Sequence, residues 1–219
     1  MEANPSPRAK STGRRLLRRE ERRAVILKGA AAAFARSGFA ATSMDDVATE
    51  CGVTRLILYR HFESKEELYR AVLQQVFDRQ AEELLRALEL GNVRGLGFRT
   101  LLTVAREHPE GFTLLWRHAA REPQFADYAR EQREAAVGAV LQLMALDSGD
   151  PLLDRFTGEL VYGWLVEGVL TWLEIGNPTR DVDAIDRATQ MLRAVRDSLG
   201  TFELGAAGAR IRRPAAPSS

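Results

Sequence analysis

The apolar residues of this chain recur at spacings of three and four from about residue 19 almost to the C-terminus. In the first such stretch Ile26, Leu27, Ala30, Ala33 and Phe34 follow this spacing, which places them on one face of a helix. No stretch alternates apolar and polar residues for long enough to predict a strand. The pattern therefore predicts an all-α fold.

Turn and capping residues between the apolar stretches predict about nine helices. Gly38 and Gly52 are placed to end the first two, over about 19–37 and 42–51. Thr42, Thr54 and Ser64 are placed to cap the second, third and fourth helices. The third and fourth are expected over about 55–62 and 65–90, and the later ones over about 98–107, 109–121, 123–144, 152–175 and from 181 onward.

Charge is unevenly distributed along the chain, although the net charge is only +1. Residues 1–28 carry nine basic and three acidic residues, whereas residues 71–209 carry 14 basic and 21 acidic ones. A basic head on an acidic body favours a polyanionic partner for the head. Residues 1–18 lack an apolar face, so they predict a mobile basic arm that either contacts this partner or remains solvated.

Membrane insertion and secretion are not expected. A membrane-spanning helix needs roughly 20 apolar residues, and the best stretch, 160–175, is shorter and contains Glu167 and Glu174. Residues 14–35 superficially resemble a secretory signal, but Lys28 interrupts their apolar run and Glu20 lies among the bases. We therefore expect a soluble, cytoplasmic protein.

The cysteine and histidine content argues against metal, cofactor or enzyme chemistry. Cys51 is the single cysteine, and the three histidines have no ligand spacing. Cys51 is expected to be a buried structural thiol, with a redox sensor as the alternative. The sequence contains no nucleophile elbow and no phosphate-binding loop. A helical enzyme is therefore the less favoured class.

Residues 42–68 contain the pattern of a helix-turn-helix. Two short helices are joined by E50-C-G-V-T54, in which the glycine takes the left-handed turn. Val47, Val53 and Leu58 are expected to pack the two helices together. The second of these helices has the width that enters the major groove of B-DNA, so we expect it to read base sequence.

The ordered motifs of this segment resemble the DNA-binding region of the TetR family of bacterial regulators. They are T42-S, A-x-x-x-G-V ending at Val53, L58-Y-x-H-F and S64-K-E-E-L68. The resemblance implies an N-terminal three-helix DNA-binding domain at 19–68 and a larger helical domain for effector binding and dimerisation at 69–204. A flexible tail would follow at 205–219. It further implies a ligand-responsive regulator, most often a repressor, that binds a palindromic DNA operator as a homodimer and is released by a small apolar or amphipathic effector.

By motif position, the resemblance assigns the DNA contacts. Phosphate contacts are expected from Thr42, Tyr59, His61 and Lys65, and Arg60 is a further candidate. Thr54 and Arg55 would lie at the groove, where Arg55 can bind guanine through two hydrogen bonds. Leu56 and Ile57 depart from the family pattern, so either one contacts a thymine methyl group or Ile57 packs internally. Phe62 is expected in the core.

The second domain is expected to hold the dimer interface and an effector cavity. The dimer interface is predicted at Val161, Trp172, Ile185, Ala188, Leu192, Val195 and Leu199, with burial inside one chain as the alternative. The effector cavity is predicted at Phe98, Leu102, Phe112, Trp116, Phe125, Tyr128 and Trp164, each of which could instead belong to the core. A helical adaptor with a vestigial DNA head is the alternative function, and the departure at Leu56 and Ile57 supports it.

Overall fold

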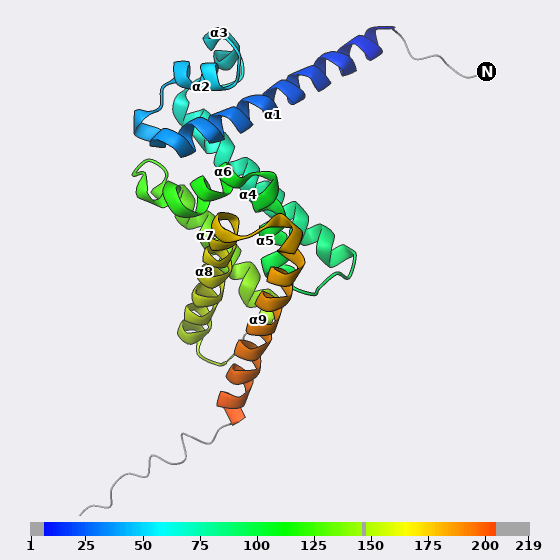
Figure 1. Ribbon diagram of the computed structural model, residues 1–219, viewed down its shortest axis with the longest axis vertical. Coiled ribbons are helices and arrows are strands. Elements are labelled where there is room, and N and C mark those ends of the chain that lie inside the picture. Colours follow the sequence, from blue (N-terminus) through cyan, green and yellow to red (C-terminus); the bar gives the residue numbers. More distant parts are fainter. Residues whose placement is uncertain (1–6, 146–147, 205–219) are drawn as a thin grey trace, which may run out of the picture. The chain divides into compact units, whose positions relative to one another are not determined.

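The computed structural model describes the backbone of residues 7–145 and 148–204, and within them the side chains of 19–145 and 148–197. This described part contains nine α-helices and no strand, which confirms the all-α prediction (Figure 1). The helices are α1 Pro7–Ala41, α2 Met44–Glu50, α3 Arg55–Tyr59, α4 Lys65–Glu89, α5 Leu96–Glu107, α6 Pro109–Thr113, α7 Ala126–Met144, α8 Pro151–Ile175 and α9 Asp181–Leu204. The expected tail at 205–219 lies outside the described residues.

The chain divides into two compact units. The first consists of the residues up to 86 together with 102–132, and the second of residues 87–101 together with those from 133 onward. This division differs from the single boundary expected at residue 68, because the first unit also takes in most of α4, the end of α5 and all of α6.

Helix α1 begins at Pro7, so residues 7–18, expected to form a mobile arm, are helical. Proline is favoured at the first position of a helix, and the arginines, lysine, leucines and alanine that follow are good helix formers. The predicted break at Gly38 is confirmed, because this residue takes a φ of 78° and kinks the helix. Ile26, Ala30 and Phe34 are fully buried.

The part of α1 at Arg19–Ala41 is long and apolar enough, by length and composition alone, to cross a membrane. The residues that make it apolar include the buried Ile26, Leu27, Ala33 and Phe34. Burial of this face within the first unit is what a core helix of a soluble protein shows.

Four aromatic rings form the centre of the first unit. Tyr69 lies 5.0 Å from both Phe34 and Phe39 and 4.5 Å from Phe125, measured between ring centroids. Edge-on and offset pairs at this separation are favourable beyond the area they bury. Burial raises the pKa of the Tyr69 phenol above its ordinary value. The cluster fixes the end of α1 to the start of α4, and therefore holds the segment between them.

The helix predicted over 109–121 is divided in the structure. α6 passes at Leu114–His118 into one π-helical turn and then at Ala119–Arg121 into a 3-10 turn. Glu122 is extended, with φ −92° and ψ 113°, because the residue before a proline is disfavoured in the helical region. A turn at 123–125 follows, in which the Phe125 backbone donates to the Glu122 carbonyl at 2.9 Å, and α7 begins after it at Ala126 and not at Pro123.

In the second unit, α8 and α9 follow each other through a short 3-10 turn at Pro178–Arg180. Asp150 caps α8 by accepting hydrogen bonds from the backbone of Leu152 (3.0 Å) and Leu153 (3.3 Å). Val169 is fully buried, and Leu165 and Leu170 nearly so. One face of α8 therefore forms the core of this unit.

Candidate nucleic-acid interface

Helix α2 begins with a reciprocal cap at Ser43. The Ser43 hydroxyl accepts a hydrogen bond from the Asp46 backbone (3.1 Å), and the Asp46 carboxylate accepts one from the Ser43 backbone (2.8 Å). Bonds from the Ser43 hydroxyl and backbone lower the pKa of the Asp46 carboxyl. The cap is thus one residue later than predicted.

Thr42 does not occupy the position that was expected for it. Its side chain is only 2% exposed, and its hydroxyl donates to the carbonyl of Gly38 at 2.7 Å. This bond satisfies a carbonyl at the kink of α1, where the regular helical pattern is interrupted. The Thr42 hydroxyl is therefore not available to donate to a phosphate, and Thr42 is not among the phosphate contacts proposed below.

The turn between α2 and α3 has the predicted geometry. Gly52 takes a φ of 63°, a left-handed conformation that glycine adopts without steric cost. The Val53 backbone donates to the Ala48 carbonyl at 3.0 Å, which closes the turn. Val47 and Leu58 are fully buried, as expected of the packing contacts. The helix-turn-helix is confirmed, and Figure 1 shows α2 next to both α1 and α3.

Helix α3 is shorter than predicted and exposes one face. It covers Arg55–Tyr59, because both His61 and Phe62 donate their backbone N–H to the Leu58 carbonyl and turn the chain. Phe62 is buried, as expected. Leu56 is 63% exposed, which is unusual for a leucine, whereas Ile57 is only partly exposed. Thr54 occupies the N-cap position, is exposed and makes no capping bond with its side chain.

The guanidinium of Arg55 is held by two neighbours. One terminal nitrogen lies 2.9 Å from the carboxylate of Asp45 on α2, and the other lies 3.3 Å from the hydroxyl of Tyr59. The group also lies 5.4 Å from the centre of the Tyr59 ring. All three side chains are exposed. A pair so exposed contributes little stability, but it restricts the directions in which Arg55 points.

Basic side chains of α1 lie near His61. Burial lowers the pKa of the His61 imidazole, and the charges of Arg19, Arg22 and Arg23 lower it further. The Arg23 guanidinium lies 5.3 Å from the centre of the Phe62 ring. Sequence reasoning did not assign Arg22 and Arg23 to the site. Their spacing of three and four from Arg19, which places all three on one helix face, was the signal that could have found them.

Lys65 also departs from its expected role. Its ammonium donates to the carbonyl of Phe39 at 2.9 Å and lies 4.3 Å from the centre of the Phe39 ring. Carbonyls near the end of a helix lack helical partners and attract a cation. Lys65 therefore fastens the start of α4 to the end of α1, and its assignment as a phosphate contact is corrected.

Cys51 fills the narrow space between α1 and the turn. Its thiol donates to the carbonyl of Ile26 at 3.5 Å, and it lies next to Gly29, where an added Cβ would stand only 2.5 Å from the sulfur. Burial, with a smaller contribution from Glu50, raises the pKa of the thiol to about 11. A thiol that stays protonated is a poor nucleophile, which favours the structural interpretation of this cysteine over a redox sensor.

The residues predicted to form an effector cavity do not come together in one unit. Leu102, Phe112, Trp116, Phe125 and Tyr128 belong to the first unit, and Phe98 and Trp164 to the second. Leu102, Phe112 and Phe125 are at most 2% exposed and belong to the core, and the Tyr128 hydroxyl is bonded to the Gln74 side chain at 2.9 Å. Phe98 and Trp164 do line a cavity of about 540 Å³ between α8 and α9.

The predicted dimer residues also need correction. Val161 and Ala188 are buried within their own chain, and Ile185 packs against Gly95. Trp172 donates to the Asp181 carboxylate at 2.7 Å, Leu192 lines a cavity, and the side chain of Leu199 lies outside the described residues. Only Val195 is prominently exposed. The periodic pattern predicted which residues share an apolar face of a helix. It did not predict which of these faces is buried within the same chain.

A group of apolar residues that shares only Val195 with the predicted set is exposed on the last two helices. We call it the apolar stripe, and it consists of Leu153, Phe156 and Leu160 on α8 with Met191 and Val195 on α9, which are 45–58% exposed. Leu153, Phe156 and Leu160 follow helical spacing and therefore share one side of α8. Exposed patches of this kind mark contacts with other molecules.

Comparison with known proteins agrees with this architecture. Residues 26–72 match the model of the bacterial regulatory proteins of the tetR family. The chain is 30% identical over 183 residues to the HTH-type transcriptional activator FasR of Mycolicibacterium smegmatis, a match that covers 80% of this chain and 82% of FasR.

Two solved structures illustrate the similarity of fold. A TetR-like transcriptional regulator from Rhodococcus sp. RHA1 aligns with a TM-score of 0.63 at 20% identity, over 80% of this chain and 93% of that one. The SmeT–triclosan complex aligns with a TM-score of 0.60 at 15% identity, over 82% and 91% of the two chains. The helix-turn-helix geometry and the FasR match together show that this chain belongs to the tetR family of bacterial regulatory proteins.

Proposed function

We propose that this transcriptional regulator binds a palindromic DNA operator as a cytoplasmic homodimer and responds to a small effector. The observation that carries the proposal is the two-sided character of α3. Leu58 is fully buried in the first unit, whereas Arg55, Leu56 and Tyr59 are exposed together. The turn before α3 fixes the direction of this short helix. A helix that exposes an arginine and a leucine in this way can enter a major groove.

The exposed groups match the chemistry of DNA. Arg55 supplies two donors for the O6 and N7 atoms of guanine, a contact worth about 1–3 kcal/mol of discrimination between bases. Leu56, with its large exposed surface, is placed to contact a thymine methyl group. Thr54, Tyr59, Arg60 and His61 are the proposed phosphate contacts, joined by Arg19, Arg22 and Arg23 of α1.

Asp45 gives the proposed reading surface an additional feature. Its carboxylate accepts from Arg55 and therefore orients the guanidinium before DNA arrives. A carboxylate near the DNA backbone also repels phosphates, so it lowers affinity for every sequence. We infer that Asp45 increases the ratio of specific to non-specific binding at the expense of total affinity.

The apolar stripe supports the proposal of a dimer. Two-fold pairing of α8 and α9 from two copies would cover Leu160 and Met191, which one chain leaves exposed. A two-fold dimer presents two copies of α3 to two half-sites, which explains why one five-residue helix suffices for a specific operator. This interface shares only Val195 with the one expected from the periodic pattern.

We also propose that a small effector releases the protein from DNA. The first candidate is a repressor, whose release increases transcription. The SmeT relative of known structure is a complex with triclosan, which supports a small-molecule site in this fold. The name of FasR as an activator favours a second candidate, in which the bound protein increases transcription. Transcription in vitro from a template bearing the operator, with and without the protein, separates the two forms by the sign of the change.

Selection of bound sequences from random duplex DNA, followed by gel shifts over a salt titration, tests the proposal. The wild type is expected to yield a palindrome and a steep negative slope of log affinity against log salt. Arg55→Ala should lower the preference for one base pair in each half-site by about 5- to 150-fold. Arg130→Ala, an exposed arginine on α7, is the control.

Leu160→Glu tests the dimer in the same assay. Because Leu160 is 57% exposed, a charge there does not disturb the fold of one chain, but it should leave a monomer in sedimentation and abolish binding to the full palindrome. Leu85→Glu on α4 introduces the same charge at a similarly exposed site and should change neither. Absence of any sequence preference in the wild type would favour the helical adaptor instead.

A further inference from the structure

A second cavity in the second unit is lined by apolar side chains and arginines. It has a volume of about 580 Å³ and lies among α7, α8, α9 and the connection between α4 and α5. Its apolar wall includes Leu88, Val93, Val140, Leu143, Val161 and Leu165. This volume is within the range of about 300–1,000 Å³ that is usual for small-molecule sites.

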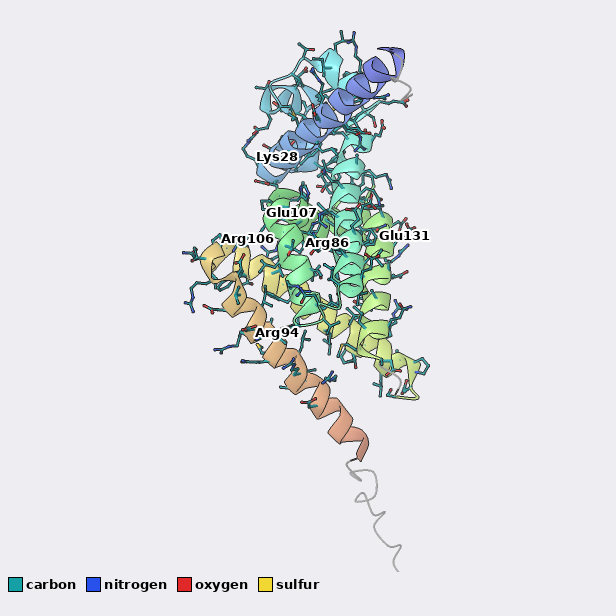
Figure 2. The ribbon with its side chains drawn as sticks, turned by 90° about the vertical axis from the view of Figure 1, so that its right-hand side faces the viewer. Lys28, Arg86, Arg94, Arg106, Glu107 and Glu131 are labelled. Carbon is teal, nitrogen blue, oxygen red and sulfur yellow. The ribbon has the colours of Figure 1, made fainter. Side chains whose placement is uncertain are left out.

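Three arginines give one side of this cavity its charge. Arg94, Arg193 and Arg196 belong to the lining, and no carboxylate does among the residues with described side chains. Arg94 is paired with Asp186 at 2.9 Å, and Figure 2 shows it beside α9. Arg196 is only 3.6 Å from its neighbour Asp197, a loose and exposed pair, and Arg193 forms no ion pair within the described part of the chain.

This composition limits the ligand that would fit. A cation would face three arginines without a lining carboxylate, so it is disfavoured. A neutral apolar molecule would contact the apolar wall but would offer no partner to Arg193, which forms no ion pair in the described part of the chain. A molecule with an apolar body and an anionic end satisfies both parts, because guanidinium groups bind carboxylates and phosphates through paired hydrogen bonds.

The cavity lies away from the apolar stripe. At about 100° per residue, Arg193 is about 160° around the α9 axis from Met191 and Val195. On α8, the cavity uses Val161 and Leu165, which lie on the buried side of the helix. The cavity that contains Phe98 and Trp164 instead includes Met191 of the stripe. Pairing of two copies through the stripe would therefore leave the arginine-lined cavity open.

We propose that this cavity binds an amphipathic anion, with Arg193 and Arg196 holding its charged end and the walls of α7 and α8 covering its apolar body. The proposal rests on the proposed function, because it names the effector class of that regulator. Binding in the cavity itself needs no DNA, so the site is testable independently of the operator.

Calorimetric titration of the full chain with dodecanoate, below the concentration at which it forms micelles, tests the site. Dodecan-1-ol and dodecyltrimethylammonium are the neutral and cationic probes of equal chain length. We expect dodecanoate to bind at least tenfold more tightly than either. In the double variant Arg193→Gln, Arg196→Gln the affinity for dodecanoate should fall at least tenfold, while that for dodecan-1-ol stays the same.

Both arginines are exposed, so the double variant is expected to fold, and circular dichroism checks this. Arg130→Gln on α7 is the matched control and should bind dodecanoate as the wild type does. Equal affinity for the three probes, or an unchanged affinity for dodecanoate in the double variant, would overturn the proposal. A gel shift with operator DNA, with and without dodecanoate, is a separate experiment. If the wild type does not bind the operator, the proposed regulatory function is refuted, but the calorimetric result for the cavity still stands.

Discussion

The close contact between Gly29 and Cys51 makes a quantitative prediction about the stability of the DNA-binding head. A methyl group added at Gly29 would stand 2.5 Å from the Cys51 sulfur and 3.2 Å from its Cα. Attractive contacts between heavy atoms lie at about 3.5–4.0 Å, so the methyl group overlaps the sulfur by about 1 Å. Overpacking of this kind costs about 1–3 kcal/mol.

Helix propensity opposes this cost. Replacing glycine by alanine inside a helix stabilises it by about 1 kcal/mol. The clash of about 1–3 kcal/mol outweighs a gain of about 1 kcal/mol over most of its range, so Gly29→Ala should lower the free energy of unfolding by up to about 2 kcal/mol. Ala35→Gly, at an exposed position of the same helix, measures the propensity contribution separately.

Urea unfolding followed by circular dichroism supplies the measurement, and a double-mutant cycle with Cys51→Ala isolates the contact. Removing the sulfur leaves only the backbone neighbours at 3.2 and 3.3 Å, which small shifts relieve. In the Cys51→Ala background, Gly29→Ala should therefore be neutral or stabilising, with a coupling equal to the removed clash, about 1–3 kcal/mol. Additive effects of the two substitutions, or a stabilising Gly29→Ala alone, would refute the reasoning.

Two further predictions concern Lys65, which fastens α4 to α1, and His61 of the proposed interface. Lys65→Met keeps the aliphatic stem but removes the ammonium bonded to the Phe39 carbonyl, so the free energy of unfolding should fall by about 1 kcal/mol, while Arg60→Met should leave the urea midpoint unchanged. Because burial and nearby arginines lower the pKa of His61 below 6.5, and a phosphate favours the protonated ring, operator affinity should rise as the pH falls from about 8 to 6. His61→Gln should reduce this rise, and the same pH dependence in the variant would exclude His61 as a phosphate contact.

The helices and the reading motif could be predicted from the sequence because their signals are local. Apolar spacing, the glycines at 38 and 52 and the serine at 64 act within one or two helical turns, so the break in α1, the turn and the cap of α4 lie where they were expected. The predicted helix boundaries were wrong where a separate turn comes before the helix. For example, a turn at 123–125 precedes α7, which begins at Ala126.

The partners of individual side chains were decided only by the tertiary structure. Thr42 and Lys65 carry donors suited to a phosphate, but each has already found a carbonyl of α1, which for Lys65 is 26 residues away in the chain. Likewise, the periodicity of α8 and α9 shows that both helices have apolar faces, but not which face the same chain buries. Val161 and Ala188 are buried, whereas Phe156 and Leu160 are exposed.

The amino-acid sequence by itself determined that this chain is helical and that a helix-turn-helix lies near its N-terminus, because both depend on short-range spacing. Folding in three dimensions decided which donors already have a partner in the chain, which apolar faces remain exposed and where the arginines of α9 meet an apolar wall. Those outcomes depend on contacts between distant segments, for which a linear pattern carries no direct signal.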